Sequence, residues 1–139
     1  MMKFSVIVPV YNGEEIIELC LDALANQGYP SEDYETTLVN DGSTDRTREI
    51  ADGYPVRLIN LETNRGLIVA RETGARAANY DLLVFNDVRA VPDSNHLRNI
   101  DALGYQPVSV GYKAHDKRRS PFDRLFYVLW LLTQPRRES

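Results

Sequence analysis

The sequence predicts an α/β fold with an open, mainly parallel sheet and helices on both faces. Two short apolar runs, residues 4–10 and 36–39, each end abruptly in polar turn residues that lead into a helical pattern. Strand and helix patterns then alternate in the order β-α-β-α-β-α-β, which right-handed crossovers convert into a parallel sheet. Ligands of such sheets bind outside the carboxyl ends of the strands, so the polar turns mark the expected binding edge.

The predicted strands are short apolar runs bounded by turn residues. They span residues 4–10, 35–39, 56–61 and 82–85, and a fifth run lies at 108–112. The run at 82–85 is continuously apolar, which is typical of a central parallel strand that is buried on both faces.

The predicted helices carry apolar side chains at intervals of three and four residues. They span residues 14–27, about 44–52, 67–79 and 94–103. Ser43 or Thr44 is the expected N-cap of the second helix, and Ser94 that of the fourth. Cys20 lies on the apolar side of the first helix, so we expect a buried core thiol there.

Composition limits the classes of function. The 139 residues suffice for one domain with a hydrophobic core, and the formal net charge of -4 argues against nucleic acid as a partner. The single cysteine excludes an internal disulfide and a cysteine metal cage. The sequence shows neither a signal peptide nor an apolar run of the ~20 residues that span a bilayer, so a cytoplasmic location is expected.

Acids and amides follow three of the predicted strands. Residues 12–14 contain an Asn and a Glu, residues 40–41 an Asn and an Asp, and residues 86–87 another Asn and Asp. Such residues also occur at strand ends because turns require them. Three such pairs in a parallel sheet would converge on one edge if their strands are neighbours, and this favours a ligand site.

Carboxylates and amides without a nearby histidine or cysteine suit hard cations and hydroxyl-rich ligands. A carboxylate can hold Mg²⁺ or Mn²⁺ together with phosphate oxygens, and the Tyr11 ring can stack on a base. The sequence contains no GxGxxG, no GxxxxGK[ST] and no GxSxG pattern. His96 is expected on the surface, in the middle of a helix.

Three segments together resemble the family 2 glycosyltransferases, which are nucleotide-sugar enzymes with the GT-A (Rossmann-like) fold. These segments are VIVPVYNGEE, LVNDGSTDRT and NRGLIVARETGARAANYDLLVFND. The resemblance covers residues 3–112. It implies a nucleotide-sugar-binding α/β domain at 1–112. The composition of residues 113–139 predicts a basic and apolar C-terminal tail helix after this domain.

The resemblance also implies roles for individual residues. Asn40 or Asp41 would hydrogen-bond the base, and Glu14 would lie near the nucleoside. Arg71 would approach the nucleotide or its phosphates, although a surface arginine paired with Glu72 or Glu62 is the alternative. The implied nucleotide-sugar site consists of Pro9, Tyr11, Asn12, Glu14, Asn40, Asp41, Ser43, Arg71, Asn86 and Asp87.

Asp87 would be the metal-binding acid of the DxD motif of the family, and it would hold Mg²⁺ or Mn²⁺. The first acid position of that motif is occupied by Phe85, and Asn86 would supply an oxygen in compensation. A single carboxylate is expected to hold a divalent cation more weakly than two. No residue of the sequence is identified as the catalytic base, and the chain is shorter than typical family members, so it resembles a fragment, a degenerate copy or a small enzyme.

The tail contains an apolar run, LFYVLWLL, between basic clusters. Residues 113–139 carry seven Lys and Arg against three Asp and Glu. An apolar helix with this flanking charge is typical of an interfacial membrane anchor, and its alternative is a helix packed in the core or in a homodimer through residues 122–132. A peripheral position on the inner face of the membrane is the corresponding expectation.

The resemblance implies transfer of a sugar from a nucleotide diphosphate sugar, with UDP as the expected nucleotide, to a hydroxyl of an acceptor glycan or a lipid-linked sugar. Inversion at the anomeric carbon is expected. A non-catalytic nucleotide-sugar-binding or interaction module is the main alternative, and an α/β ligand-binding domain unrelated to sugars is a further one.

Overall fold

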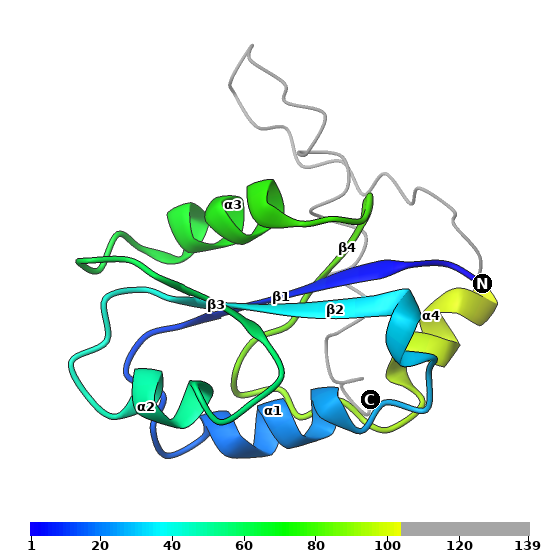
Figure 1. Cartoon of the computed structure of the whole chain (residues 1–139), viewed down its shortest axis with the longest axis horizontal. Coiled ribbons are helices and arrows are strands. Elements are labelled where there is room, and N and C mark those ends of the chain that lie inside the picture. Colours follow the sequence, from blue (N-terminus) through cyan, green and yellow to red (C-terminus); the bar gives the residue numbers. More distant parts are fainter. Residues whose placement is uncertain (104–139) are drawn as a thin grey trace, which may run out of the picture.

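Four parallel strands form the central sheet in the computed structural model, which describes residues 1–103 (Figure 1). The strand order is β3-β2-β1-β4. The strands are β1 (Phe4–Val10), β2 (Tyr34–Asn40), β3 (Arg57–Asn60) and β4 (Leu82–Phe85). The open parallel sheet predicted from the sequence is therefore confirmed, with β1 and β2 at its centre. The predicted strand at 108–112, the tail helix and the domain boundary at 112 lie outside the described residues.

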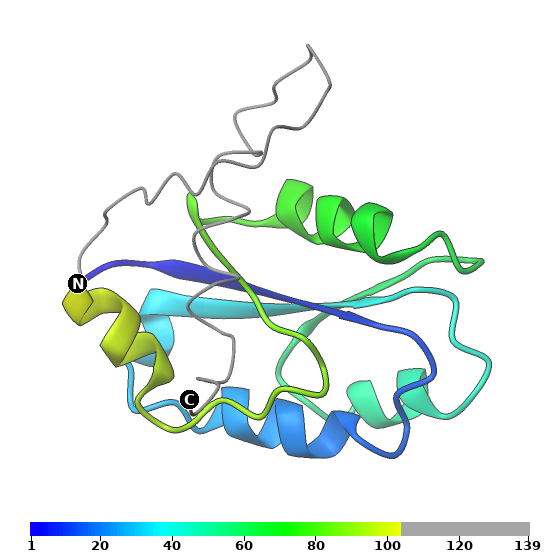
Figure 2. The same ribbon diagram turned by 180° about the vertical axis from the view of Figure 1, so that it is seen from behind.

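Helices cover both faces of this sheet, as predicted. Helix α3 packs on one face, against β1 and β2, and α1 and α2 lie on the other (Figures 1 and 2). The helices are α1 (Ile17–Ala25), α2 (Thr47–Ala51), α3 (Leu67–Ala77) and α4 (His96–Leu103), with a short 3₁₀ turn η1 (Ser31–Asp33) before β2. Within the described residues, no helix is both long enough and apolar enough to cross a membrane.

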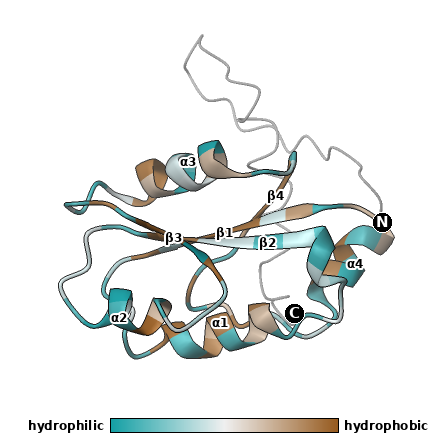
Figure 3. Ribbon diagram, in the orientation of Figure 1, coloured by the Kyte–Doolittle hydropathy of each residue, from teal (hydrophilic) through white to brown (hydrophobic). Residues whose placement is uncertain are grey.

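Strand β1 is buried along its whole length. Successive side chains of a strand point to opposite faces of the sheet, so β1 contributes to two apolar clusters. Val6 and Val8 pack with Leu21 of α1, whereas Ile7 packs with Phe85 and Ala75 on the α3 side. Figure 3 shows the hydrophobic residues gathered in β1 and β4, between the two helical layers.

Pro9 lies inside β1, where a missing N–H would normally weaken the sheet. The carbonyl of Ile7 accepts a hydrogen bond from the N–H of Asn86, so the polar backbone groups of Ile7 face β4. Pro9 follows two residues later and faces the same side. Strand β4 has already ended at Phe85, so the proline removes no bond of the β1–β4 ladder.

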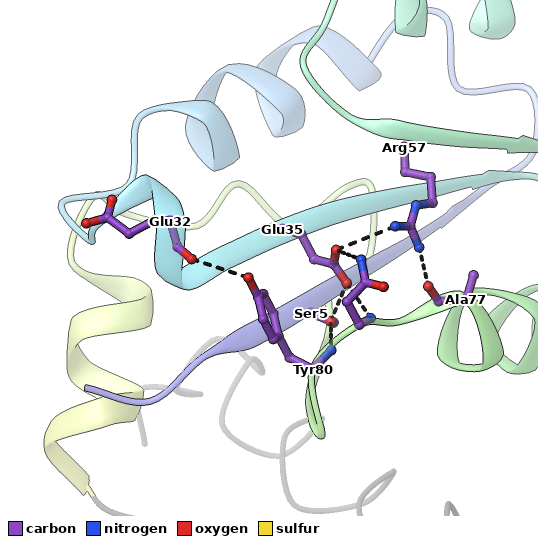
Figure 4. Close-up of polar contacts among 7 residues, drawn as sticks. Ser5, Glu32, Glu35, Arg57, Ala77 and Tyr80 are labelled. Carbon is purple, nitrogen blue, oxygen red and sulfur yellow. Dashed lines mark hydrogen bonds and ion pairs between the residues drawn. The ribbon is translucent and has the colours of Figure 1, made fainter.

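A polar cluster ties together the amino ends of the strands, at the edge opposite the polar turns (Figure 4). Glu35 of β2 is its centre. The hydroxyl of Ser5 donates to Glu35 at 2.6 Å, and the backbone and side-chain nitrogens of Asn79 donate to it at 2.7 Å each. The guanidinium of Arg57 lies 3.8 Å from the same carboxylate and also donates to the carbonyl of Ala77.

The run at 82–85 is buried on both faces, as predicted, with Leu83 and Phe85 in one apolar cluster and Val84 in the other. Among the described residues β4 is the last strand of the sheet, so its predicted central position stays a prediction. The prediction for His96 was wrong. His96 is not an exposed residue in mid-helix: it is the first residue of α4, it is half-buried, and burial lowers the pKa of its imidazole.

The second helix is shorter than predicted, and neither Ser43 nor Thr44 caps it. Helix α2 begins at Thr47, with Arg46 as N-cap and no side-chain cap hydrogen bond. The hydroxyl of Ser43 accepts a hydrogen bond from the N–H of Asn12 instead. The hydroxyl groups of Ser43 and Thr44 therefore contact Asn12 of the neighbouring loop rather than their own helix.

Candidate functional site

The polar turns after β1, β2 and β4 lie at one edge of the sheet, as the sequence predicted. These three strands are adjacent in the order β2-β1-β4. The N–H of Asp41 donates to the carbonyl of Val10 at 2.8 Å, and the N–H of Asn86 donates to the carbonyl of Ile7 at 2.9 Å. The turns after β2 and β4 are thus each hydrogen-bonded to β1 at their first residue. This edge of the sheet is where α/β proteins bind ligands.

Asn12 and Ser43 join the first two turns. The N–H of Asn12 donates to the Ser43 hydroxyl at 2.9 Å, and the Asn12 side-chain oxygen accepts from the N–H of Thr44 at 2.8 Å. Asn12 adopts a left-handed backbone conformation with φ of 48°, which asparagine tolerates better than most residues. Both residues were predicted as ligand contacts, and the structure shows that they also connect the two loops.

Glu14 and Asp45 add two further hydrogen bonds between the same loops, since each carboxylate accepts from a backbone N–H of the other loop. The N–H of Glu14 donates to Oδ2 of Asp45 at 3.1 Å, and the N–H of Arg46 donates to a Glu14 carboxylate oxygen at 3.1 Å. Oδ1 of Asp45 accepts from the backbone N–H and the hydroxyl of Thr47 at 3.0 and 2.5 Å. The Thr47 hydroxyl in turn accepts from the N–H of Gly13 at 2.9 Å. We call residues 12–14 with residues 43–47 the loop clasp.

Asp45 and Thr47 are residues that the sequence reasoning missed. Burial raises the pKa of the Asp45 carboxyl, but its bonds with Thr47 and Glu14 outweigh burial and lower that pKa overall. The signal available in the sequence was the Asp that follows the DGST segment. An Asp just before a helix is an ordinary turn residue, and only the fold reveals its bond to a residue 31 positions earlier.

Asn40 and Asp41 are buried at the end of β2. The Asn40 amide donates to the side-chain oxygen of Asn60 at 2.8 Å, and its own oxygen accepts from the N–H of Ser43 at 3.1 Å. The Asp41 carboxylate is 4% exposed and accepts from the N–H groups of Arg65 and Gly66 at 2.7 and 3.0 Å. Asp41 therefore orients the turn that begins α3, and its further lone pairs remain as acceptors for a ligand.

Gly42 lets the turn before α3 approach the end of β2 closely. Its φ of 72° lies in the left-handed region, and an added Cβ would lie 2.4 Å from the backbone nitrogen of Asn64. Any side chain at this position would separate the two segments. The glycine after Asp41 is thus required by backbone packing beside the site.

Tyr11 is the aromatic member of the predicted site. It follows β1 directly, and 51% of its surface is exposed. An exposed aromatic ring at this edge can stack on a planar ligand such as a base.

Asn86 is buried in the turn after β4, where its amide nitrogen is used within the protein. Its side chain is buried, with residue exposure of 2%, and its amide donates to Sγ of Cys20 and to the carbonyls of Asp87 and Ala90. It holds the turn after β4 in place. Cys20 beneath it is the buried core thiol that the sequence predicted, and burial raises the pKa of this thiol to about 12.

Asp87 is paired with Arg89, and its charge also acts on Arg71. Its Oδ1 accepts from the N–H of Arg89 at 2.8 Å and lies 3.3 Å from the guanidinium Nε of that residue. Arg71 of α3 is half-buried, and burial lowers the pKa of its guanidinium, whereas the charge of Asp87 raises it. Nε of Arg71 is buried without a hydrogen-bond partner among the described residues. The alternative prediction was a surface arginine paired with Glu72 or Glu62. Within residues 1–103, Glu72 pairs with Arg76 instead, and neither Glu72 nor Glu62 forms an ion pair with Arg71.

The donor set at this edge does not fit a resident divalent cation. Within residues 1–103, no group of three His, Cys, Asp or Glu side chains could hold a metal ion. Phe85 occupies the first acid position, the Asn86 amide nitrogen donates within the turn, and Asp87, the carboxylate of this turn, is already paired with Arg89. The prediction that Asn86 compensates for the missing acid finds no support in this geometry.

The chain is similar in sequence to known glycosyltransferases. The family model "Glycosyl transferase family 2" matches residues 5–103. Glycosyltransferase AglE of Haloferax volcanii is 39% identical over 98 residues, which cover 67% of this chain and 32% of AglE. The poly(ribitol-phosphate) beta-N-acetylglucosaminyltransferase TarS of Staphylococcus aureus is 46% identical over 70 residues, which cover 48% of this chain and 12% of TarS.

Solved structures agree with these matches. S. aureus TarS 1–349 in complex with UDP-GlcNAc has a TM-score of 0.69 at 34% identity, over 73% of this chain and 30% of that one. The mannosyltransferase PcManGT from Pyrobaculum calidifontis, in complex with GDP-Man and Mn²⁺, has a TM-score of 0.68 at 32% identity, over 76% and 33% of the two chains. The chain thus spans about a third or less of the length of these relatives.

Proposed function

The chain belongs to glycosyl transferase family 2 and has its GT-A fold, and on this basis we propose that it binds a nucleoside diphosphate sugar with UDP as the nucleotide. The observation that supports this most directly is the loop clasp, which holds two of the family-like segments together at the carboxyl ends of β1 and β2. TarS, a relative of the same fold, was solved with UDP and with UDP-GlcNAc.

The proposed ligand would occupy the edge formed by the turns after β1, β2 and β4. Tyr11 would stack on the base, and the free lone pairs of Asp41 would accept a hydrogen bond from the base edge. Arg71 would meet the phosphates, where an arginine gives charge-assisted hydrogen bonds. Glu14 and Ser43 would act mainly by holding the loops in shape.

The proposed reaction is inverting transfer of the sugar to an acceptor hydroxyl. The hydroxyl oxygen attacks the anomeric carbon while the bond from that carbon to the diphosphate oxygen breaks. A base must take the hydroxyl proton, and no residue between 1 and 103 is assigned to that role. Cations beside the leaving group offset the charge that develops on the diphosphate. An acceptor glycan or lipid-linked sugar, and a peripheral membrane or dimer contact through residues 122–132, remain predictions.

Calorimetric titration of UDP, and of GDP for comparison, tests this proposal. We expect saturable UDP binding that Tyr11→Ala weakens about tenfold, because base stacking on an aromatic ring contributes roughly 1–3 kcal/mol. Leu19→Ala, which removes another exposed apolar side chain, is the matched control and should bind as the unaltered protein does.

The result decides between the enzyme and its alternatives. UDP binding together with sugar transfer from UDP-GlcNAc, followed as UDP release, would support the enzyme. UDP binding without turnover on any acceptor would favour the nucleotide-sugar-binding module. Failure to bind either nucleotide would contradict the proposal.

A further inference from the structure

The turn after β4 carries an exposed arginine beside Asp87, the acid that the family resemblance assigns to metal binding. Arg89 follows Asp87 by two residues, and its guanidinium lies 3.3 Å from the Asp87 carboxylate. The side chain of Arg89 is 78% exposed and that of Asp87 50%. This pair lies at the edge proposed to bind the nucleotide.

Arg71 brings a second positive charge to the same carboxylate. It lies on α3, its Nε is buried without a hydrogen-bond partner among the described residues, and the charge of Asp87 acts on it. One carboxylate and two guanidinium groups sum to one positive charge. One carboxylate with one divalent cation has the same sum, so the two arrangements present equal formal charge to an incoming diphosphate.

We propose that Arg89, together with Arg71, neutralises the diphosphate of the donor in place of a divalent cation, so that nucleotide binding by this chain is independent of metal. This inference rests on the proposed function. It assigns a role in ligand binding to Arg89, which no motif of the sequence identified.

The geometry of Arg89 allows this role. A guanidinium has five N–H donors, and its contact with Asp87 through Nε leaves the other nitrogens for phosphate oxygens. Planar bidentate contact with phosphate is characteristic of arginine. An exposed ion pair is weakly held, so the guanidinium can turn toward a diphosphate at little cost in free energy.

Two substitutions distinguish the arginine from a metal. Asp87→Asn keeps an oxygen that can accept from the N–H of Arg89 but removes the negative charge. If Asp87 held a metal, this variant would lose UDP binding. If Arg89 neutralises the diphosphate, Asp87→Asn should bind UDP as well as or better than the unaltered protein, and Arg89→Ala should bind it about tenfold more weakly, since charge-assisted hydrogen bonds are lost.

The experiment is a calorimetric UDP titration of the full chain and its variants, in EDTA and in Mn²⁺. Arg76→Ala is the matched control, because Arg76 is also an exposed arginine paired with a carboxylate, at 2.6 Å from Glu72 on α3. We expect the unaltered chain to bind UDP with equal affinity in EDTA and in Mn²⁺. Arg89→Ala should bind UDP more weakly, whereas Arg76→Ala should not. Arg89→Lys should recover part of the lost affinity.

Other outcomes overturn the inference in distinguishable ways. Binding that disappears in EDTA and in Asp87→Asn would show a metal at Asp87, while leaving the proposed nucleotide site intact. If binding is independent of metal and Arg89→Ala binds UDP as tightly as the unaltered protein, Arg89 does not contact the nucleotide. No UDP binding by the unaltered chain in either buffer would overturn the proposed function and this inference together.

Discussion

Asp45 is the residue on which the geometry of the loop clasp depends. It binds the N–H of Glu14 in one loop and the N–H and hydroxyl of Thr47 in its own. We predict that Asp45→Ala destabilises the fold by about 1–3 kcal/mol, because backbone donors lose a charged acceptor. It should also weaken UDP binding, since the two loops are then no longer held in the binding geometry.

Urea unfolding and UDP titration measure these two effects. Asp52→Ala is the control, because Asp52 is an exposed acid at the end of the same helix. Asp45→Asn should recover part of the affinity, since its amide oxygen can still accept one of the bonds. Unchanged stability and affinity in Asp45→Ala would show that the loops hold their shape without this carboxylate.

At the scale of the element, helix α3 depends on Gly74 to approach the sheet closely. A Cβ at this position would lie 2.4 Å from Cγ2 of Ile7 and 3.1 Å from Cγ2 of Val39. We predict that Gly74→Ala destabilises the protein by about 1–2 kcal/mol, because overpacking costs roughly 1–3 kcal/mol and the gain in helix propensity returns up to about 1 kcal/mol.

Chemical denaturation compares this variant with Gly53→Ala. The nearest atom to a Cβ at Gly53 is 3.4 Å away, so that substitution meets only ordinary contact and should change stability little. If Gly74→Ala were as stable as the unaltered protein, α3 would have room to move away from β1 and β2.

At the scale of the whole molecule, Glu35 links β1, β2, β3 and the segment after α3 at the edge opposite the site. Burial raises the pKa of its carboxyl, but the bonds from Asn79 and Ser5 and the charge of Arg57 outweigh burial and lower that pKa overall. Its folded-state pKa is therefore below the unfolded value of about 4.3. The stability that Glu35 contributes is present above the unfolded pKa and is lost as the pH falls through the folded one.

We predict that Glu35→Gln lowers the free energy of unfolding at pH 7 and reduces the loss of stability between pH 7 and pH 3. Urea unfolding at a series of pH values measures both quantities. Glu62→Gln, which alters an exposed carboxylate outside the cluster, should leave the pH profile unchanged. An identical pH profile for Glu35→Gln would show that the cluster does not depend on the ionised carboxyl.

The fold and the position of the site were readable from the sequence because their signals are local. Apolar runs, helical spacing and turn residues predicted the four described strands, the parallel sheet and the edge at which the turns meet. The burial of Cys20 followed from its place in a helical pattern. Errors arose where local signals are ambiguous, as in the caps before α2 and the exposure of His96.

What the sequence determined by itself is the order of the elements and the family-like segments at one edge of the sheet. Only the tertiary structure decided which polar side chains of that edge bind the neighbouring loop. Asp45 reaches back to Glu14, Asp41 reaches forward to Arg65 and Gly66, and Asn86 turns inward. The physical reason is that most of these partners are 24 or more residues apart in the chain, so no local pattern encodes the choice between loop and ligand.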